Sequence, residues 1–516
     1  MRLPARSIAV LTMLALLSGA AGAVSKSAAA AAPDESGVAR APTTDVAHTT
    51  DHVLVLHGKS IHYQATAGTL TLRDHLGEPI ASMFYIAYTV PPAKGYSERP
   101  VTFLFNGGPG SASLWLNIGG FGPMRAVTEK PGNTPAPPYS FVPNDDSLLD
   151  KTDLVFLDAI GTGYSRVIGK GSDAQFWSVD GDVDSFAKGI ARYIESNHRW
   201  NSPKFLYGES YGTTRAAALA YALHVEDIDV SGVILQSSIL NFARSSPGLD
   251  EGYIDLLPSY AAAAWYHHRV ADAPADEMAF LKQVETFARG PYAQALAAGD
   301  QLSPQEEAAV ARQVSDYTGL PVEYVERSHL RVEMESFRRE LLRGQGLVIG
   351  RFDSRYAWPA VETDGHFNPA TDDPATAAVN GPYLAAFRVA LDGLDYSTSL
   401  EYRALYNQVI EPRWNWHHIA PGMDEPLTSP DTALDLAAVM AANPNLKVLS
   451  LNGLYDMSTP FFGTEFDLSH MLLPQSVSRN ITIKYYASGH QLYSNPRVLD
   501  EMTGDLDRFY DEAPAH

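Results

Sequence analysis

Two hydrophobic patterns along the chain predict two kinds of β-strand. In the first part, short runs alternate apolar and polar residues or are rich in β-branched ones, which predicts antiparallel strands. These runs lie at 53–56, 61–63, 69–72 and 83–88. Further along, the runs are almost continuously apolar, which is typical of parallel strands covered by helices on both faces. They lie at 101–105, 154–157, 205–207, 230–235, 446–451 and 481–486.

Helical patterns separate several of the apolar runs, as at 183–196 and 211–223. Alternating strands and helices predict βαβ units and therefore an α/β fold. From about residue 245 to 430 the alternation stops, and the chain is predicted to be mostly helical. The sequence therefore predicts one α/β domain, residues 51–244 and 431–516, interrupted by a helical cap insertion at 245–430.

The first 23 residues have the pattern of a secretory signal peptide. Arg2 and Arg6 precede an apolar stretch at 8–17, and Ala21-Gly22-Ala23 supplies a small-residue cleavage site. We therefore expect cleavage near Ala23 and a secreted or periplasmic location. The apolar stretch is shorter than a bilayer span, so no membrane insertion is expected. Residues 24–50 are rich in Ala, Pro, Thr and Ser, which predicts a flexible leader.

Composition narrows the possible partners. The chain has 516 residues, and 38 Lys and Arg against 60 Asp and Glu give a net charge of −22. Without a basic patch, nucleic acid is not an expected partner. The chain has no Cys, so disulfides are excluded, and bacterial export fits this better than a eukaryotic secretory route. Histidine pairs such as His417-His418 lack the spacing of a helical zinc site, and no metal or organic cofactor is expected. No pattern indicates an oligomeric state.

The most informative motif is Gly208-Glu209-Ser210-Tyr211-Gly212. It follows the predicted strand at 205–207 directly and precedes a helical, Ala-rich stretch. Gly-x-Ser-x-Gly between a strand and a helix is the pattern of a nucleophile elbow. The two glycines allow a strained turn that raises the serine hydroxyl above the sheet. Such a serine needs a base to take its proton and a carboxylate to orient that base.

Asp456 and His490 are the candidates for these two roles. Each follows a predicted strand, at 446–451 and 481–486, and the C-terminal edge of the strands is where α/β sheets place their ligands. The order Ser, acid, His along the chain is that of an α/β-hydrolase. Asn106–Gly110, after the strand at 101–105, is a glycine turn that could offer N–H groups to an oxyanion.

These blocks, together with Asp158 and Gly161–Ser165, resemble the serine carboxypeptidase family over about residues 100–240 and 446–495. The resemblance implies an α/β-hydrolase fold and a peptide substrate. It also implies roles for individual residues: Ser210 as nucleophile, His490 as general base, Asp456 as its orienting acid, the N–H groups of Gly108 and Tyr211 as oxyanion hole, and Asn106 and Glu209 as ligands of the substrate's free carboxylate. Glu209 must be protonated to donate to a carboxylate, so peptide hydrolysis is expected to favour acidic pH.

The sequence departs from the family at three positions. Leu104 stands where the family usually has Trp, Ser111 where it has Cys, and Gly120 where it has a Glu of the carboxylate-binding network. These changes leave the predicted triad intact but leave open whether the enzyme is a strict exopeptidase. A serine esterase or acyltransferase on the same fold stays as an alternative, and a non-catalytic binding protein on a hydrolase scaffold is a third interpretation.

Overall fold

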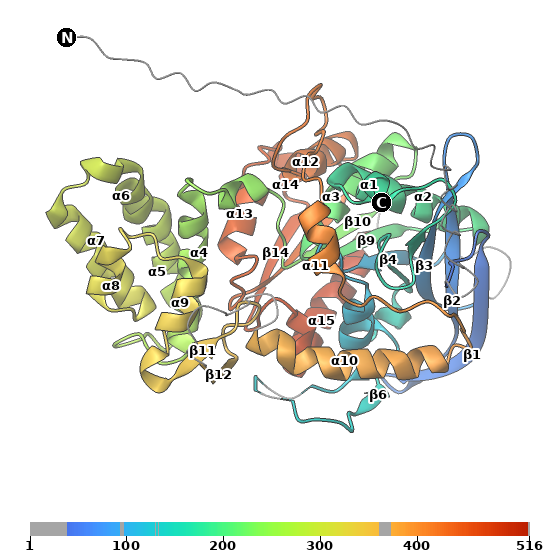
Figure 1. Ribbon diagram of the computed structural model, residues 1–516, viewed down its shortest axis with the longest axis horizontal. Coiled ribbons are helices and arrows are strands. Elements are labelled where there is room, and N and C mark those ends of the chain that lie inside the picture. Colours follow the sequence, from blue (N-terminus) through green and yellow to red (C-terminus); the bar gives the residue numbers. More distant parts are fainter. Residues whose placement is uncertain (1–38, 93–97, 129–130, 133, 361–372, 514–516) are drawn as a thin grey trace, which may run out of the picture. The chain divides into compact units, whose positions relative to one another are not determined.

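The computed structural model describes residues 39–92, 98–128, 131–132, 134–360 and 373–513. Its centre is a mixed sheet with the strand order β1-β2-β3-β7-β4-β9-β10-β13-β14, in which β8 pairs with β3 (Figure 1). Its strands are β1 (Val46–Leu56), β2 (Lys59–Arg73), β3 (Pro79–Thr89), β4 (Val101–Phe105), β7 (Asp153–Leu157), β8 (Arg166–Val167), β9 (Lys204–Glu209), β10 (Gly232–Gln236), β13 (Lys447–Gly453) and β14 (Ile481–Tyr486). Pairing is antiparallel from β1 to β7 and parallel from β7 to β14, which confirms the predicted α/β-hydrolase fold.

Helices and short hairpins surround this sheet. The helices are α1 (Asp173–Phe176), α2 (Val179–Ser196), α3 (Tyr211–Val225), α4 (Glu251–Tyr266), α5 (Glu277–Phe287), α6 (Ala293–Ala298), α7 (Pro304–Thr318), α8 (Val322–Arg327), α9 (Met334–Glu340), α10 (Pro374–Asp392), α11 (Asn407–Ile410), α12 (Ala433–Ala442), α13 (Phe461–Ser469), α14 (Gln475–Ser478) and α15 (Pro496–Glu512). Two hairpins pair β5 (Met124–Ala126) with β6 (Phe141–Pro143) and β11 (Leu347–Ile349) with β12 (Ala357–Pro359).

The central strands bury side chains on both faces, as their apolar runs predict. In β9, Leu206 packs into the core beneath α2, α3 and α12, whereas Phe205 and Tyr207 pack on the opposite face against α15. All three side chains are fully buried, and each contributes about 1.5–3 kcal/mol of hydrophobic stabilisation. Because β9 is held from both sides, the turn that follows it has a fixed position.

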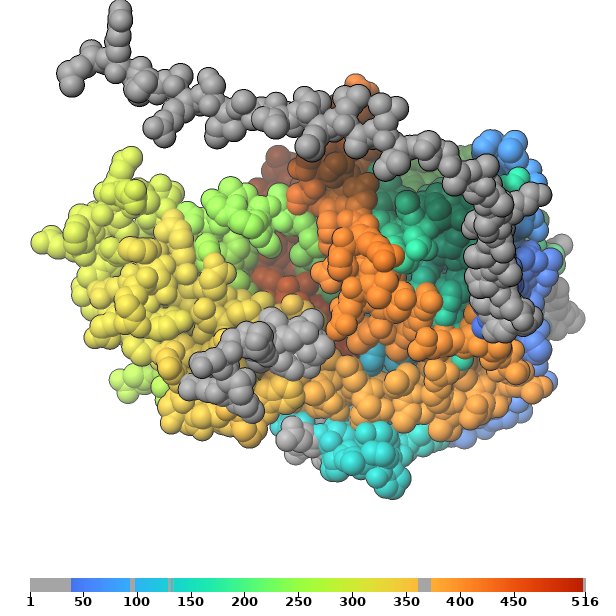
Figure 2. Space-filling view, in the orientation of Figure 1, coloured from blue at the N-terminus to red at the C-terminus, as the bar shows by residue number. Residues whose placement is uncertain are grey.

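The segment between β10 and β13 is mostly helical but does not pack as one unit. Helices α4 to α9 form a hydrophobic core of their own with residues that follow β13, such as Leu454 and Phe461. Helix α10, in contrast, packs into the core of the sheet through side chains that include Tyr383 and Phe387. In Figure 2, red atoms from the C-terminal part of the chain lie recessed between light green and orange segments of this insertion.

One stretch of the insertion, which the sequence predicts only as mostly helical, is divided by a turn. The stretch 322–342 forms two helices, α8 and α9, because the chain turns between them. His329 and Leu330 have φ angles of 48° and 66°, in the left-handed region that an α-helix cannot contain.

The N-terminal boundary also differs from the prediction. Strand β1 begins at Val46, inside the predicted leader, and pairs with β2 along its whole length from Val46 opposite Thr69 to Leu56 opposite Lys59. As an edge strand it is largely exposed, so its polar sequence does not show the burial pattern of a strand. Residues 1–38, with the predicted signal peptide and most of the leader, lie outside the described residues. Within the described ranges, every helix is too short or too polar to cross a membrane.

Candidate active site

The predicted nucleophile elbow has the backbone that its motif requires. Strand β9 ends at Glu209, Ser210 has φ 61° and ψ −132°, and α3 begins at Tyr211. A non-glycine residue in this conformation stores about 1–3 kcal/mol of strain, which the surrounding structure must hold. A Cβ on Gly208 would lie 2.0 Å from the carbonyl oxygen of Gly212, so only glycine fits there.

Asp456 and His490 are in direct contact. Asp456 Oδ2 lies 2.7 Å from His490 Nδ1, and the two side chains are 0% and 3% exposed. The amides of Ser458 and Thr459 donate to Asp456 Oδ1 at 2.8 and 3.0 Å, and the Thr459 hydroxyl donates to Oδ2 at 2.6 Å. Burial opposes the charged imidazole, but the charge and hydrogen bond of Asp456 outweigh it and raise the pKa of His490. These hydrogen bonds hold the Asp456 carboxyl in place against the imidazole.

Hydrogen bonds to residues at the end of β10 connect the backbone of Ser210 with that of His490. The Ser210 amide donates to the carbonyl of Gln236 at 3.1 Å, and the hydroxyl of the next residue, Ser237, donates to the carbonyl of His490 at 2.7 Å. In the described part of the chain the His490 ring hydrogen-bonds Asp456 and Thr459, and Ser210 is not among its partners. In substrate-free enzymes the contact between nucleophile and base is often long and tightens when substrate binds.

The glycine turn after β4 packs against the start of α3. A Cβ on Gly107 would lie 2.5 Å from the amide nitrogen of Tyr211, so the turn and the elbow are in contact. Gly108 has φ 112° and is exposed, although its neighbours Gly107 and Pro109 are buried. The Gly108 and Tyr211 amides thus lie on two backbone segments that meet beside Ser210.

A buried ion pair that the sequence analysis did not predict fixes this turn. Arg215, on α3, donates to the carbonyl of Asn106 at 2.8 Å and to Asp182 Oδ2 at 2.7 Å. The Arg215 side chain is 0% exposed, and its guanidinium lies 4.2 Å from the ring centroid of Phe186. Arg215 therefore ties the glycine turn to the helix that begins beside the nucleophile.

Glu209 and Asn106, the predicted carboxylate ligands, are brought together by the structure. Both are 3% exposed, and the Asn106 side-chain oxygen accepts the amide of Leu116 at 3.1 Å. Burial raises the pKa of Glu209 to about 7, although the neighbouring His490 and Asn106 oppose this shift. Gln236 donates its side-chain amide to Glu209 Oε2 at 3.2 Å. Glu209 is thus largely protonated in mildly acidic solution.

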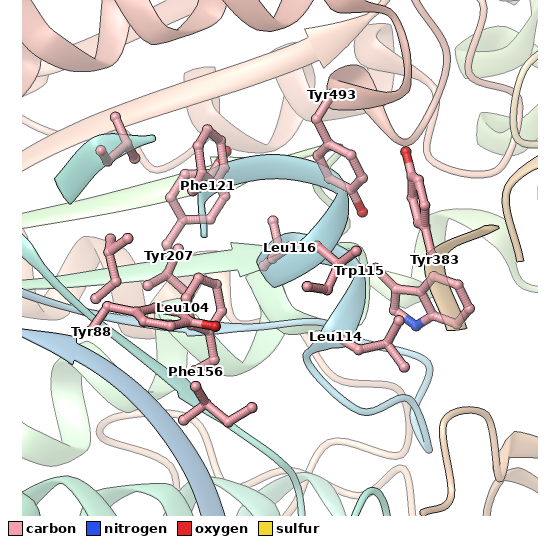
Figure 3. Close-up of a cluster of buried hydrophobic side chains, with 14 of the residues drawn as sticks. Tyr88, Leu104, Leu114, Trp115, Leu116, Phe121, Phe156, Tyr207, Tyr383 and Tyr493 are labelled. Carbon is pink, nitrogen blue, oxygen red and sulfur yellow. The ribbon is translucent and has the colours of Figure 1, made fainter. Parts of the chain in front are cut away.

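Aromatic side chains fill the space around Gly120. The ring of Tyr493 lies 3.4 Å from the position of a Cβ on Gly120, and a Cβ on Gly119 would come within 2.7 Å of Tyr383 and Tyr493. Figure 3 shows the two tyrosine rings next to each other beside Trp115. The Tyr493 hydroxyl faces the Glu209 carboxyl, yet it forms no well-aligned hydrogen bond within the described residues.

The other two departures have simple packing roles. Leu104 is fully buried in the core cluster of Figure 3. Ser111 accepts a hydrogen bond of 2.8 Å from the indole nitrogen of Trp115. Asp158 braces the loop that ends at Ser165: its carbonyl accepts from the Ser165 hydroxyl at 2.7 Å, and its Oδ1 accepts the Ser113 amide at 2.8 Å.

Comparison with known proteins assigns the chain to a family. The sequence profile of the family described as serine carboxypeptidase matches residues 60–322, half of the chain. The chain belongs to the serine carboxypeptidase family. Retinoid-inducible serine carboxypeptidases of Rattus norvegicus and Mus musculus are each 28% identical to it over 148 residues. These matches span 28% of this chain and only 29% of the relatives' own length.

The architecture of this serine carboxypeptidase family member is similar to that of a solved relative. Kex1, described as a prohormone-processing carboxypeptidase from Saccharomyces cerevisiae, matches with a TM-score of 0.54 at 16% identity. The match covers 87% of this chain and 91% of the yeast chain, so the likeness of fold extends through most of the insertion. In the described residues, His, Asp and Glu side chains form no group of three or more suited to a metal ion.

Proposed function

We propose that this chain is an exported serine carboxypeptidase that removes C-terminal residues from peptides through an acyl-enzyme on Ser210. One observation carries the proposal. The contact between Asp456 and His490 is 2.7 Å long and buried, and hydrogen bonds through Gln236 and Ser237 link it to the backbone of Ser210, which has a strained conformation. Family membership and this geometry together favour a hydrolase of peptide bonds over a binding protein.

In the proposed mechanism, His490 takes the proton of the Ser210 hydroxyl as that oxygen attacks the scissile carbonyl. The amides of Gly108 and Tyr211 donate to the oxyanion of the tetrahedral intermediate. His490 then passes its proton to the leaving amine, and the acyl-enzyme forms. Water attacks this ester with His490 again as base, which releases the acid and restores Ser210. Asp456 orients the imidazole throughout and stabilises the imidazolium.

The exopeptidase part of the proposal depends on Asn106 and Glu209. A protonated Glu209 can donate to the free carboxylate of a substrate, and its pKa of about 7 makes this form available below neutral pH. Export is supported by the signal-peptide pattern at 1–23. Finding all of the protein in the cytoplasm of its cells, with residues 1–23 uncleaved, contradicts export.

The test compares wild type with Ser210→Ala on N-blocked dipeptides that have free or amidated C-termini. We expect wild type to cleave the free acids and to react with a fluorophosphonate at Ser210, and the variant to do neither. Undiminished turnover by Ser210→Ala refutes the proposed nucleophile. Equal cleavage of the free and amidated substrates by wild type refutes the exopeptidase part alone.

A serine esterase or acyltransferase is the second candidate, and Gly120 favours it. The family's usual Glu is absent there, and the ring of Tyr493 packs against the glycine instead. A chromogenic ester that is hydrolysed while all peptides are refused supports this alternative.

A further inference from the structure

A loop of the helical insertion reaches both halves of the proposed acid–base pair. Residues 350–356 connect β11 to β12. The Arg351 carbonyl accepts the amide of Met457, next to the acid, at 3.1 Å. The Phe352 carbonyl accepts the amide of His490 at 2.6 Å. The loop is therefore anchored at the catalytic residues, and its side chains lie close to the place of reaction.

The Arg351 side chain lies one aromatic ring away from the catalytic imidazole. Its guanidinium carbon is 4.4 Å from the ring centroid of Phe352. The centroid of the Phe352 ring is in turn 4.9 Å from that of His490. The positive charge of Arg351 acts against protonation of His490, which is consistent with this short separation.

Arg351 is half-buried, and its side chain forms no ion pair within the described residues, although Asp373 accepts its backbone amide. Its Nε is shielded from solvent and has no hydrogen-bond partner there. Its neighbour Arg355 differs, because Asp353 accepts its Nε at 2.9 Å and its Nη2 at 2.6 Å. An Nε–H that is shielded from water without a partner is unfavourable, and the planar donors of a guanidinium match a carboxylate.

A second arginine close to the residues that follow Asp456 already has an ion-pair partner. Arg244 lines a cavity of about 390 Å³ together with Met457 and Ser458. Asp255 accepts two hydrogen bonds from Arg244, at 2.9 and 2.5 Å. Its charge is therefore neutralised within the protein. Arg351 is the better candidate to attract an anionic group in a chain whose net charge is −22.

We propose that Arg351 binds a carboxylate of the substrate and so raises kcat/KM on substrates that carry this group. The inference rests on the proposed peptidase function. The carboxylate comes either from the C-terminus or from an Asp or Glu side chain beside the scissile bond, and both present the same planar acceptor to the guanidinium.

The experiment compares Arg351→Gln with wild type on matched N-blocked dipeptides. One pair of substrates differs only by Glu against Gln beside the scissile bond, and a second differs only by a free against a methyl-esterified C-terminus. We expect the variant to lose about 10-fold or more in kcat/KM on the carboxylate member of one pair, the loss of a charge-assisted contact. A loss on every free acid assigns the C-terminus, and a loss limited to Glu substrates assigns the side chain.

Controls separate this proposal from the proposed function. Arg327→Gln removes another guanidinium, 5.6 Å from the ring centroid of Tyr324 on α8, and is expected to behave as wild type. Arg351→Lys keeps the charge and should retain part of the preference, whereas high salt should weaken the preference of wild type. Substrate ratios that stay the same in Arg351→Gln, Arg351→Lys and wild type overturn the role of Arg351. Absence of peptidase activity and of fluorophosphonate labelling in wild type refutes the proposed function instead.

Discussion

Glu209 and His490 place opposite demands on pH. The proposed base, His490, must be neutral, whereas Glu209 must carry a proton to donate to the substrate carboxylate. Burial raises the pKa of Glu209 to about 7, and Asp456 holds the pKa of His490 above its ordinary value in spite of burial. For free-acid substrates we therefore expect a bell-shaped profile of kcat/KM that reflects the coupled pair and has its maximum near or below neutral pH.

The pKa of Glu209 sets the size of the effect. Once the pH is well above 7, the protonated fraction falls about tenfold per pH unit, and kcat/KM on free acids should fall with it. The same shift affects stability. The folded state holds the proton more tightly than the unfolded state, so the stabilisation present below pH 4.5 is lost as pH rises through about 7. The interval from 4.5 to 7 corresponds to about 3 kcal/mol, the most that Glu209→Gln could restore at alkaline pH.

The assay measures kcat/KM from about pH 5 to 9 for wild type and Glu209→Gln, on a free-acid dipeptide and on an uncharged ester. Since glutamine donates at any pH, the variant should lose the alkaline limb and keep the acidic limb that His490 determines. Wild type acting on the ester should also lack the alkaline limb. An alkaline limb that persists unchanged in Glu209→Gln, or a wild-type rate on free acids that still rises above about pH 9, refutes the reasoning.

Two further predictions concern stability. Burial disfavours charged His418, but Asp180 and Asp435, 2.6 and 2.8 Å away, raise its pKa to about 9. This stabilisation is complete below pH 6.5 and is lost as the pH rises through about 9. In urea titrations we expect His418→Asn to lower the free energy of unfolding by about 2 kcal/mol at low pH and by little at high pH. The first figure is discounted because Asp180 is half-exposed. Equal losses at both pH values would contradict this. Arg215→Met should lower the free energy of unfolding by about 3–5 kcal/mol, because it leaves Asp182 buried and unpaired. Adding Asp182→Leu should restore the stability, while kcat stays low. A double variant as unstable as Arg215→Met contradicts this prediction.

The sequence predicts those parts of the candidate site that depend on short local motifs. Ser210, Asp456 and His490 could be put forward as a triad because each stands in a short motif at the end of a strongly apolar strand. Arg215 and Thr459 could not. A basic residue in an Ala-rich helix usually faces solvent, and Arg215 is buried only because Asp182, from another helix, neutralises it. Thr459 hydrogen-bonds both Asp456 and His490, but a threonine three residues after an aspartate has no distinguishing pattern.

The fold was predictable to the same degree. Continuous apolar runs predict the central strands well, because a strand that is buried on both faces needs apolar residues at every position. Strand β1 is held by its backbone hydrogen bonds with β2 and is largely exposed, so residues 46–50 lack the alternation of apolar and polar side chains that predicts a strand. Helix α10 has apolar residues through most of its length, but its sequence does not say whether they face the insertion or the sheet.

The position of the loop at 350–356 connects the insertion to the proposed chemistry. More than a hundred residues of sequence separate it from each of the segments that it holds, so no local pattern could have revealed the contact. Asp353 accepts the amide of Gly489 at 3.1 Å, and Arg355 donates to the carbonyl of Ala487 and to the hydroxyl of Ser488. The loop thus fixes the backbone of the histidine segment from one side while Ser237 holds it from the other. Because the insertion supplies both this support and the guanidinium of Arg351, a change within it can alter specificity and orientation of the base together, without touching any residue of the proposed triad.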